Sequence, residues 1–144
     1  DVKNRIFCKE INPQNLLPIV MEVASGQREF MNVYGNDYKT NDGTCLRDYI
    51  HVNDLAVGHV KAIKYLSNSD KIITNLATGK FHSVLDVIKC TEKITDKSIN
   101  YEIIDRREGD PDILYASSNN LLNLECKHSD LDTIVKTMWK IYKA

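Results

Sequence analysis

Arg47 is the first residue whose type and setting suggest binding chemistry. It follows Leu46 and precedes Tyr49 by two positions, so a strand in this segment would partly bury its guanidinium. A buried guanidinium needs an anionic partner. The residues alone leave two interpretations open, a structural ion pair with Asp48 or Asp54 or a bound phosphate.

A second basic segment, RREGDP, runs from residue 106 to residue 111. Adjacent arginines beside a glycine suit bidentate recognition of a phosphate group. Asp110, three positions after Arg107, could accept hydrogen bonds from sugar hydroxyls, as acidic residues do in nucleotide sites. The alternative is a charged turn that is simply solvated.

The residues needed for dinucleotide binding are not found in this sequence. A dinucleotide site needs a glycine-rich turn that lets backbone amides approach the pyrophosphate. The glycines at 26, 35, 43, 58, 79 and 109 fit neither GxGxxG nor a P-loop, and no tyrosine has a lysine four residues later. We therefore expect no cofactor-binding residue and no catalytic Tyr-Lys pair in this chain.

The cysteines and histidines do not form a metal-binding pattern. Cys8, Cys45, Cys90 and Cys126 are widely spaced, without the close pairs that zinc sites require. The spacing predicts four free thiols in a reducing, cytoplasmic setting. His51 and His59 have no matching cysteine or carboxylate pair, so we expect no metal.

The composition is that of an ordinary globular domain. The chain has 144 residues, of which 42% are hydrophobic and 27% charged, with a formal net charge of -1. This balance lacks the basic field typical of nucleic-acid binding, and no apolar run approaches the roughly 20 residues of a membrane span. The first residue is Asp1 rather than Met, which suits a chain cut from a longer one.

The periodicity predicts a mixed α/β fold with short strands and about four helices. Expected helices follow Asn15, Asn53 or Asp54, Ser83 (with Asp86 completing a capping box), and Ser129 or Asp130. Expected strands cover residues 30–34, 47–51, 71–76 and 99–104. Alternation of helices and strands favours some parallel pairing, although the segments are too few for a complete doubly wound sheet.

The longest informative stretch, YGNDYKTNDGTCLRDYIHVNDLAVGHVKA, covers residues 34–62. It closely resembles the signature of UDP-galactose 4-epimerases in the extended short-chain dehydrogenase family. NPQNLLPIV, NLATGKFHSVLDV, RREGDPD and the closing helix with Trp139 agree in order. The resemblance runs from about Asn12 to the C-terminus and implies the C-terminal, substrate-binding portion of a Rossmann-type epimerase.

The resemblance also implies which residues contact a UDP-sugar. Asn15 and Leu16 would form the pocket floor, Asn32, Val33 and Tyr34 would meet the uracil, and Val84 would supply an apolar contact. Arg47 and Arg107 would hold the diphosphate, and Asp110 would bind the ribose hydroxyls. Leu114 falls at the position that limits entry of N-acetylated sugars.

The activity implied by the resemblance is that of a cytoplasmic NAD-dependent isomerase that interconverts UDP-glucose and UDP-galactose, commonly as a homodimer. We expect residues 1–144 to bind the UDP-hexose, NAD to be bound by an absent N-terminal domain, and no turnover by this chain alone. One alternative is a truncated, non-catalytic UDP-sugar-binding or interaction module. Another is a related sugar-nucleotide dehydratase or decarboxylase, against which RDYIHVNDL argues.

Overall fold

Helices and strands alternate along most of the chain in the computed structural model, which describes residues 1–3, 5–6, 8–116 and 121–143. The mixed α/β fold with four helices and short strands is confirmed. Within the described residues the elements are α1 (Leu16–Ala24), β1 (Met31–Tyr34), β2 (Leu46–Asp48), α2 (Val52–Leu66), β3 (Phe81–Ser83), α3 (Val84–Thr95), β4 (Tyr101–Ile104), β5 (Ile113–Leu114) and α4 (Leu131–Tyr142).

The strands form two small sheets, and both contain the parallel pairing that the sequence predicts. β1 and β4 pair in parallel, with Met31 opposite Tyr101 and Tyr34 opposite Ile104. β2 lies between β3, which is antiparallel to it, and β5, which is parallel to it. The loops that leave the carboxyl ends of β1 and β4 therefore begin side by side.

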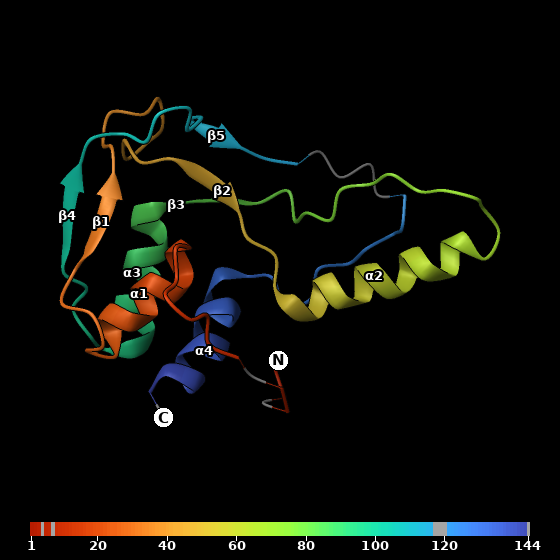
Figure 1. Cartoon of the computed structure of the whole chain (residues 1–144), viewed down its shortest axis with the longest axis horizontal. Coiled ribbons are helices and arrows are strands. Elements are labelled where there is room, and N and C mark those ends of the chain that lie inside the picture. Colours follow the sequence, from red (N-terminus) through yellow and green to blue (C-terminus); the bar gives the residue numbers. More distant parts are fainter. Residues whose placement is uncertain (4, 7, 117–120, 144) are drawn as a thin grey trace.

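Helices α1, α3 and α4 pack together against β1 and form the core (Figure 1). Val20, Val87 and Val135 are fully buried there. The predicted capping box is present, because the Ser83 hydroxyl accepts from the Asp86 amide at 2.9 Å and the Asp86 carboxylate accepts from the Ser83 amide at 3.0 Å. These local signals fix the start of α3.

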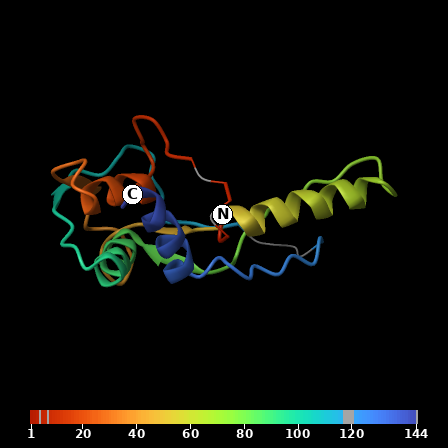
Figure 2. The ribbon, with the colours of Figure 1, turned by 90° about the horizontal axis from the view of Figure 1, so that it is seen from below.

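Helix α2 extends away from this core (Figures 1 and 2). The predicted cap at Asn53 or Asp54 is wrong, because the helix begins at Val52 and the His51 ring accepts from the Asn53 amide at 3.0 Å. Its apolar side chains are largely exposed, with Val60 at 52% and Ile63 at 69%. The sequence has a helical period here, but the described residues do not bury the apolar face of this helix.

A buried polar cluster joins the start of α2 to the start of α4. The Asp54 carboxylate accepts from the Ser129 hydroxyl at 2.6 Å and from the His128 amide at 2.8 Å. The His51 amide donates to the Ser129 hydroxyl at 2.9 Å, and its ring lies 3.0 Å from the Thr137 hydroxyl. Burial lowers the pKa of His51 below its usual 6.5. These contacts give one oxygen of the buried Asp54 carboxylate two hydrogen bonds.

Two further expectations need correction. Residues 71–76 form no strand, since β propensity reflects packing on a pleated surface rather than an intrinsic backbone preference; instead Leu76 packs beside Gly58 of α2. Asn15 occupies the N-cap position of α1, but its side chain does not cap the helix and donates to Glu10 at 3.2 Å.

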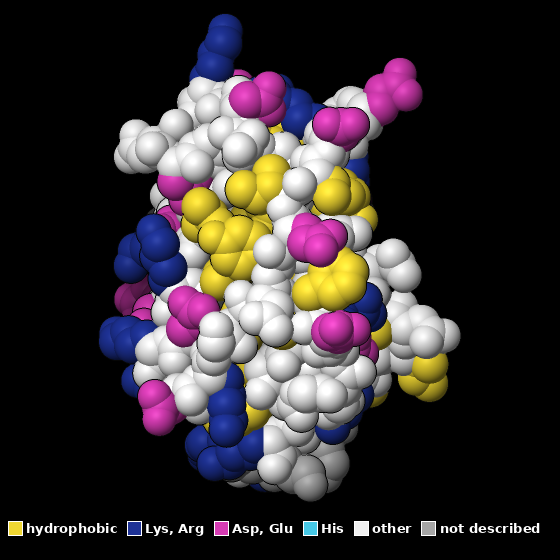
Figure 3. Space-filling model, turned by 90° about the vertical axis from the view of Figure 1, so that its left-hand side faces the viewer, with side chains coloured by type: hydrophobic (Ala, Val, Ile, Leu, Met, Phe, Trp, Pro, Cys, Tyr) yellow, Lys and Arg dark blue, Asp and Glu magenta, His cyan; other side chains and the backbone are white. Residues whose placement is uncertain are grey.

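The surface carries both signs of charge. Figure 3 shows the face at the left of Figure 1, where hydrophobic side chains lie among acidic and basic ones rather than within a field of one sign. The four cysteines are free thiols, as predicted. Among the described residues, no helix has the length and apolar character needed to span a bilayer.

Candidate functional site

A cavity of about 610 Å³ opens between the first turn of α1, the strands β1 and β2, the start of α3 and the turn at 105–112. Pockets of this size suit small-molecule ligands. It brings together nine of the residues predicted from the sequence, which are Asn15, Leu16, Asn32, Val33, Tyr34, Arg47, Val84, Arg107 and Asp110.

Leu114 is the predicted site residue that the structure does not bring to this cavity. It lies on β5 as the parallel partner of Arg47, and 58% of it is exposed. Its role in admitting N-acetylated sugars stays a prediction.

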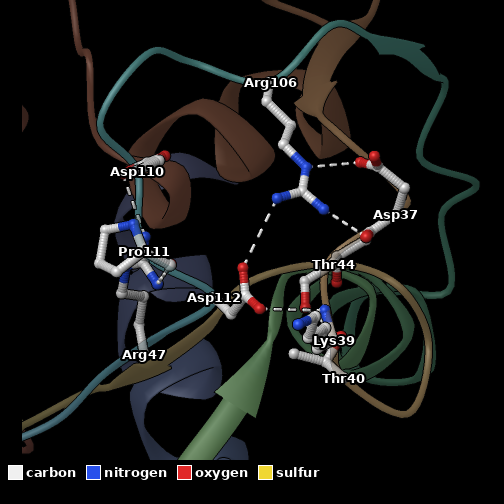
Figure 4. Close-up of polar contacts among 9 residues, drawn as sticks. All are labelled: Asp37, Lys39, Thr40, Thr44, Arg47, Arg106, Asp110, Pro111 and Asp112. Carbon is white, nitrogen blue, oxygen red and sulfur yellow. Dashed lines mark hydrogen bonds and ion pairs between the residues drawn. The ribbon is translucent and has the colours of Figure 1, made fainter.

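Arg47 is held on the cavity wall by three hydrogen bonds. Nη1 donates to the carbonyl of Leu46 at 2.8 Å. Nη1 also donates to the Pro111 carbonyl at 3.0 Å, and Nη2 donates to the Asp110 carboxylate at 3.1 Å (Figure 4). The side chain is 19% exposed, as expected for a partly buried guanidinium. Arg47 thus pairs across the chain with Asp110.

The two carboxylates proposed as local partners of Arg47 are used elsewhere. Asp48 accepts from the Thr78 hydroxyl at 2.6 Å and the Gly79 amide at 2.8 Å, and so fixes the loop before β3. Asp54 is occupied by the cluster at the start of α4. The local ion pair is therefore not the one that forms.

Arg107 reaches the cavity from the turn that follows β4. Its guanidinium carbon lies 3.7 Å from the ring centroid of Tyr34, and the hydrogen bond from Arg107 is the main cause that lowers the pKa of Tyr34. In the part of the chain that the structure describes, Arg107 forms no ion pair with a carboxylate. Its positive charge is therefore available to an anionic ligand.

Cys45 and Tyr49 also line the cavity, although sequence reasoning did not single them out. They flank Arg47 at two-residue intervals, and alternate residues of a strand share a face, so the period of β2 could have identified both. Burial raises the pKa of the Cys45 thiol and raises that of Tyr49 to about 12. Both groups stay neutral near pH 7 and can act as donors.

Other lining residues carried no usable sequence signal. Gln14 precedes the cap of α1, and the rest come from α1, β1 and α4, where their apolar types suit a core equally well: Leu17, Pro18, Ile19, Met31 and Met138. Most of the wall is thus apolar, with the two arginines and Asp110 supplying the charge. Such a site suits an anionic ligand that also has a flat or apolar group.

The described residues contain no group of three or more histidine, cysteine, aspartate or glutamate side chains placed to hold a metal ion. The cations available to an anion at this cavity are therefore the two arginine side chains.

Comparison with curated proteins gives consistent matches, although no protein-family profile matches the chain. The UDP-glucose 4-epimerase of Bos taurus is 44% identical over 135 residues, covering 91% of this chain and 38% of the relative. That of Halalkalibacterium halodurans is 44% identical over 147 residues, covering 99% of this chain and 44% of the relative. The chain therefore spans less than half the length of these relatives.

Solved structures of UDP-glucose 4-epimerases also match nearly the whole of this chain and less than half of their own length. The UDP-glucose 4-epimerase of Brucella ovis, in complex with NAD, aligns with a TM-score of 0.92 and 36% identity over 99% of this chain and 45% of that chain. The enzyme of Bifidobacterium longum, in complex with NAD+ and UDP, aligns with a TM-score of 0.83 and 39% identity over 92% of this chain and 41% of that chain.

Proposed function

This chain belongs to the UDP-glucose 4-epimerase family, whose C-terminal portion it matches, and we propose that its 144 residues anchor the uridine diphosphate of a UDP-hexose during epimerisation. The sugar would be UDP-glucose or UDP-galactose. The proposal rests mainly on one observation, the convergence of Arg47 and Arg107 on a single, mostly apolar cavity.

The two arginines suit the diphosphate for different reasons. Arg107 has no competing carboxylate among the described residues, whereas Arg47 is positioned beside Asp110. A diphosphate that takes hydrogen bonds from Arg47 would compete with Asp110 and leave that carboxylate free to accept from ribose hydroxyls. Hydrogen bonds to charged groups contribute about 1.5–3 kcal/mol each, so the pair would supply several kcal/mol of affinity.

The nucleobase would lie on the β1 side of the cavity. Asn32 offers amide hydrogen bonds there, and Val33 and Tyr34 line the wall beside it. Asn15 and Leu16, at the start of α1, and Val84, at the start of α3, also line the cavity. This placement supports the assignments that the family resemblance implies, with the base bound at one end and the hexose directed away from the arginines.

Anchoring a non-reacting part of the substrate lowers KM, because it binds the ground state and the transition state alike while the sugar reacts. In this proposal NAD supplies the hydride chemistry when bound, and a Tyr-Lys pair moves the proton. Both belong to polypeptide outside these residues, since the sequence holds neither the glycine fingerprint nor the pair.

The exposed face of α2 supports contact with such polypeptide. Val57 is 47% exposed, Val60 52% and Ile63 69%, all on one helix that extends from the core. Contiguous exposed apolar residues mark interaction surfaces. We propose that this surface packs against the domain that holds NAD.

The test is a calorimetric titration of UDP and UDP-galactose, with an epimerisation assay in the presence of NAD. The full-length enzyme should bind both ligands and interconvert the sugars, whereas the 144-residue chain alone should show no turnover. Robust turnover by the chain alone, or a full-length enzyme that binds no UDP, would contradict the proposal.

A further inference from the structure

We propose that Arg106, which does not line the cavity, is a positioning residue that holds Arg107 and Asp110 in their UDP-binding places. The inference rests on the proposed function. Its basis is a set of contacts behind the cavity that join the loop at 35–45 to the turn at 105–112 (Figure 4).

Arg106 connects the two loops that leave the parallel strands β1 and β4. Its Nε donates to the Asp37 carboxylate at 2.6 Å, and its Nη2 donates to the Asp37 carbonyl. Its Nη1 lies 3.6 Å from the Asp112 carboxylate. One guanidinium therefore contacts both loops at once, and the hydrogen bond from Arg106 is the main cause that lowers the pKa of Asp37.

The side chain of Arg106 is seated on a buried aromatic ring. Its guanidinium carbon lies 4.0 Å from the ring centroid of Tyr38, which is 3% exposed. Gly35 allows this approach, because a Cβ there would lie 2.6 Å from Arg106 Cγ and 2.8 Å from Tyr38 Cε2. Gly35 also has a φ of +82°, which other residues rarely adopt. The glycine backbone and the Tyr38 ring together accommodate the Arg106 side chain in this position.

The turn at 105–112 is thus held from two sides. On one side Arg106 and Asp112 attach it to the 35–45 loop, since Asp112 also accepts from the Lys39 amide at 3.2 Å. On the other side Arg47 binds Asp110 at 3.1 Å. Arg107 lies between these attachments and faces Tyr34. Removing Arg106 would leave the Lys39–Asp112 hydrogen bond as the described attachment on that side, and UDP binding would then have to order a more loosely held turn.

Such ordering weakens binding without changing the contacts in the complex. We expect Arg106→Gln to weaken UDP binding about tenfold. This is the typical effect of losing one charged side chain that keeps a binding site ordered. Asp37→Asn should weaken binding in the same direction but less, because the carbonyl of residue 37 can still accept from Arg106, and the double variant should be no weaker than Arg106→Gln alone. Lys93→Gln is the matched control, since Lys93 pairs with an aspartate on the surface between α3 and α4.

The experiment measures UDP affinity by calorimetry and steady-state kinetics with UDP-galactose in the full-length enzyme. A positioning role raises KM in Arg106→Gln and leaves kcat near wild type, because anchoring of the diphosphate acts on ground state and transition state alike. Simple destabilisation would instead lower the active fraction, and so kcat, with KM unchanged. If Arg106→Gln does not fold, Asp37→Asn decides the same question.

Two results would overturn the inference. Unchanged UDP affinity and KM in Arg106→Gln or Asp37→Asn, with a wild type that binds UDP, would remove the positioning role and leave the proposed function intact. A wild-type enzyme that does not bind UDP would overturn the function, and this inference with it.

Discussion

The Arg47 guanidinium lies 3.1 Å from the Asp110 carboxylate, a residue 63 positions away in the sequence. The phosphate-binding and ribose-binding candidates therefore contact each other before any ligand arrives. Asp110 keeps the partly buried guanidinium hydrogen-bonded and oriented, so that a diphosphate can bind to it without reorienting it. The two arginines of the cavity consequently differ in how much they contribute to the fold.

The first prediction follows from that difference. Arg47→Ala removes hydrogen bonds to two carbonyls and to Asp110, so it should lower the free energy of unfolding by about 1–3 kcal/mol as well as weaken UDP binding. Chemical denaturation and calorimetry on the same variant measure the two effects. A variant of wild-type stability would show that the pair contributes nothing to the fold.

The second prediction concerns Arg107, whose described contact is the face of Tyr34. Arg107→Ala should weaken UDP and UDP-galactose by the same factor, about tenfold to a hundredfold, with little change in stability. Uridine, which has no phosphate, should bind equally to the wild type and the variant. Altered sugar discrimination with unchanged UDP affinity would count against the assignment.

The third prediction separates the ring of Tyr38 from its hydroxyl. The hydroxyl is buried and has no hydrogen-bond partner among the described residues, whereas the ring supports Arg106. Tyr38→Phe should therefore match the wild-type unfolding free energy within about 1 kcal/mol or exceed it, since burying an unpaired hydroxyl is costly. Tyr38→Leu, which removes the ring, should weaken UDP binding. A large loss of stability in Tyr38→Phe would reveal a partner for the hydroxyl.

The fourth prediction is a pH dependence of stability. The pKa of His51 is lowered below 6.5, chiefly by burial and against the attraction of Asp54, so the folded state favours the neutral ring. Below pH 6.5 the unfolded chain binds more protons than the folded one. The stability that the neutral His51 ring contributes to the fold is therefore fully present above pH 6.5 and is lost as the pH falls.

Urea unfolding of the wild type, His51→Gln and His59→Gln at several pH values checks this. His51→Gln should lose that part of the pH dependence, and His59→Gln, which changes an exposed histidine of α2, should retain it. Equal pH dependence in all three proteins would show that His51 does not cause it.

Signals contained in a few neighbouring residues predicted structure well. The Ser83–Asp86 capping box and the start of α4 after Asp130 depend on local spacing, and both are found as predicted. The cap of α2 was misplaced because His51 caps through a ring nitrogen, while Asn53 and Asp54 are the commoner capping types nearby.

Long-range contacts were harder to predict. Arg47 had two carboxylates within seven residues, and nothing local shows that both are used by other segments. Arg106 looked equivalent to Arg107 in sequence, yet successive side chains leave the turn on different sides, and only the fold shows which one faces the cavity. The family signature predicted the residues as a set, and the structure shows which of them line one cavity and which contacts hold them there.

We propose that Arg47 and Arg107 together bind the diphosphate of a UDP-hexose. The most direct measurement is a calorimetric titration of UDP and uridine into the full-length enzyme and into its Arg47→Gln, Arg107→Gln double variant. We expect the wild type to bind UDP far more tightly than uridine and the double variant to lose most of this preference. A double variant that keeps the full preference for UDP would contradict it.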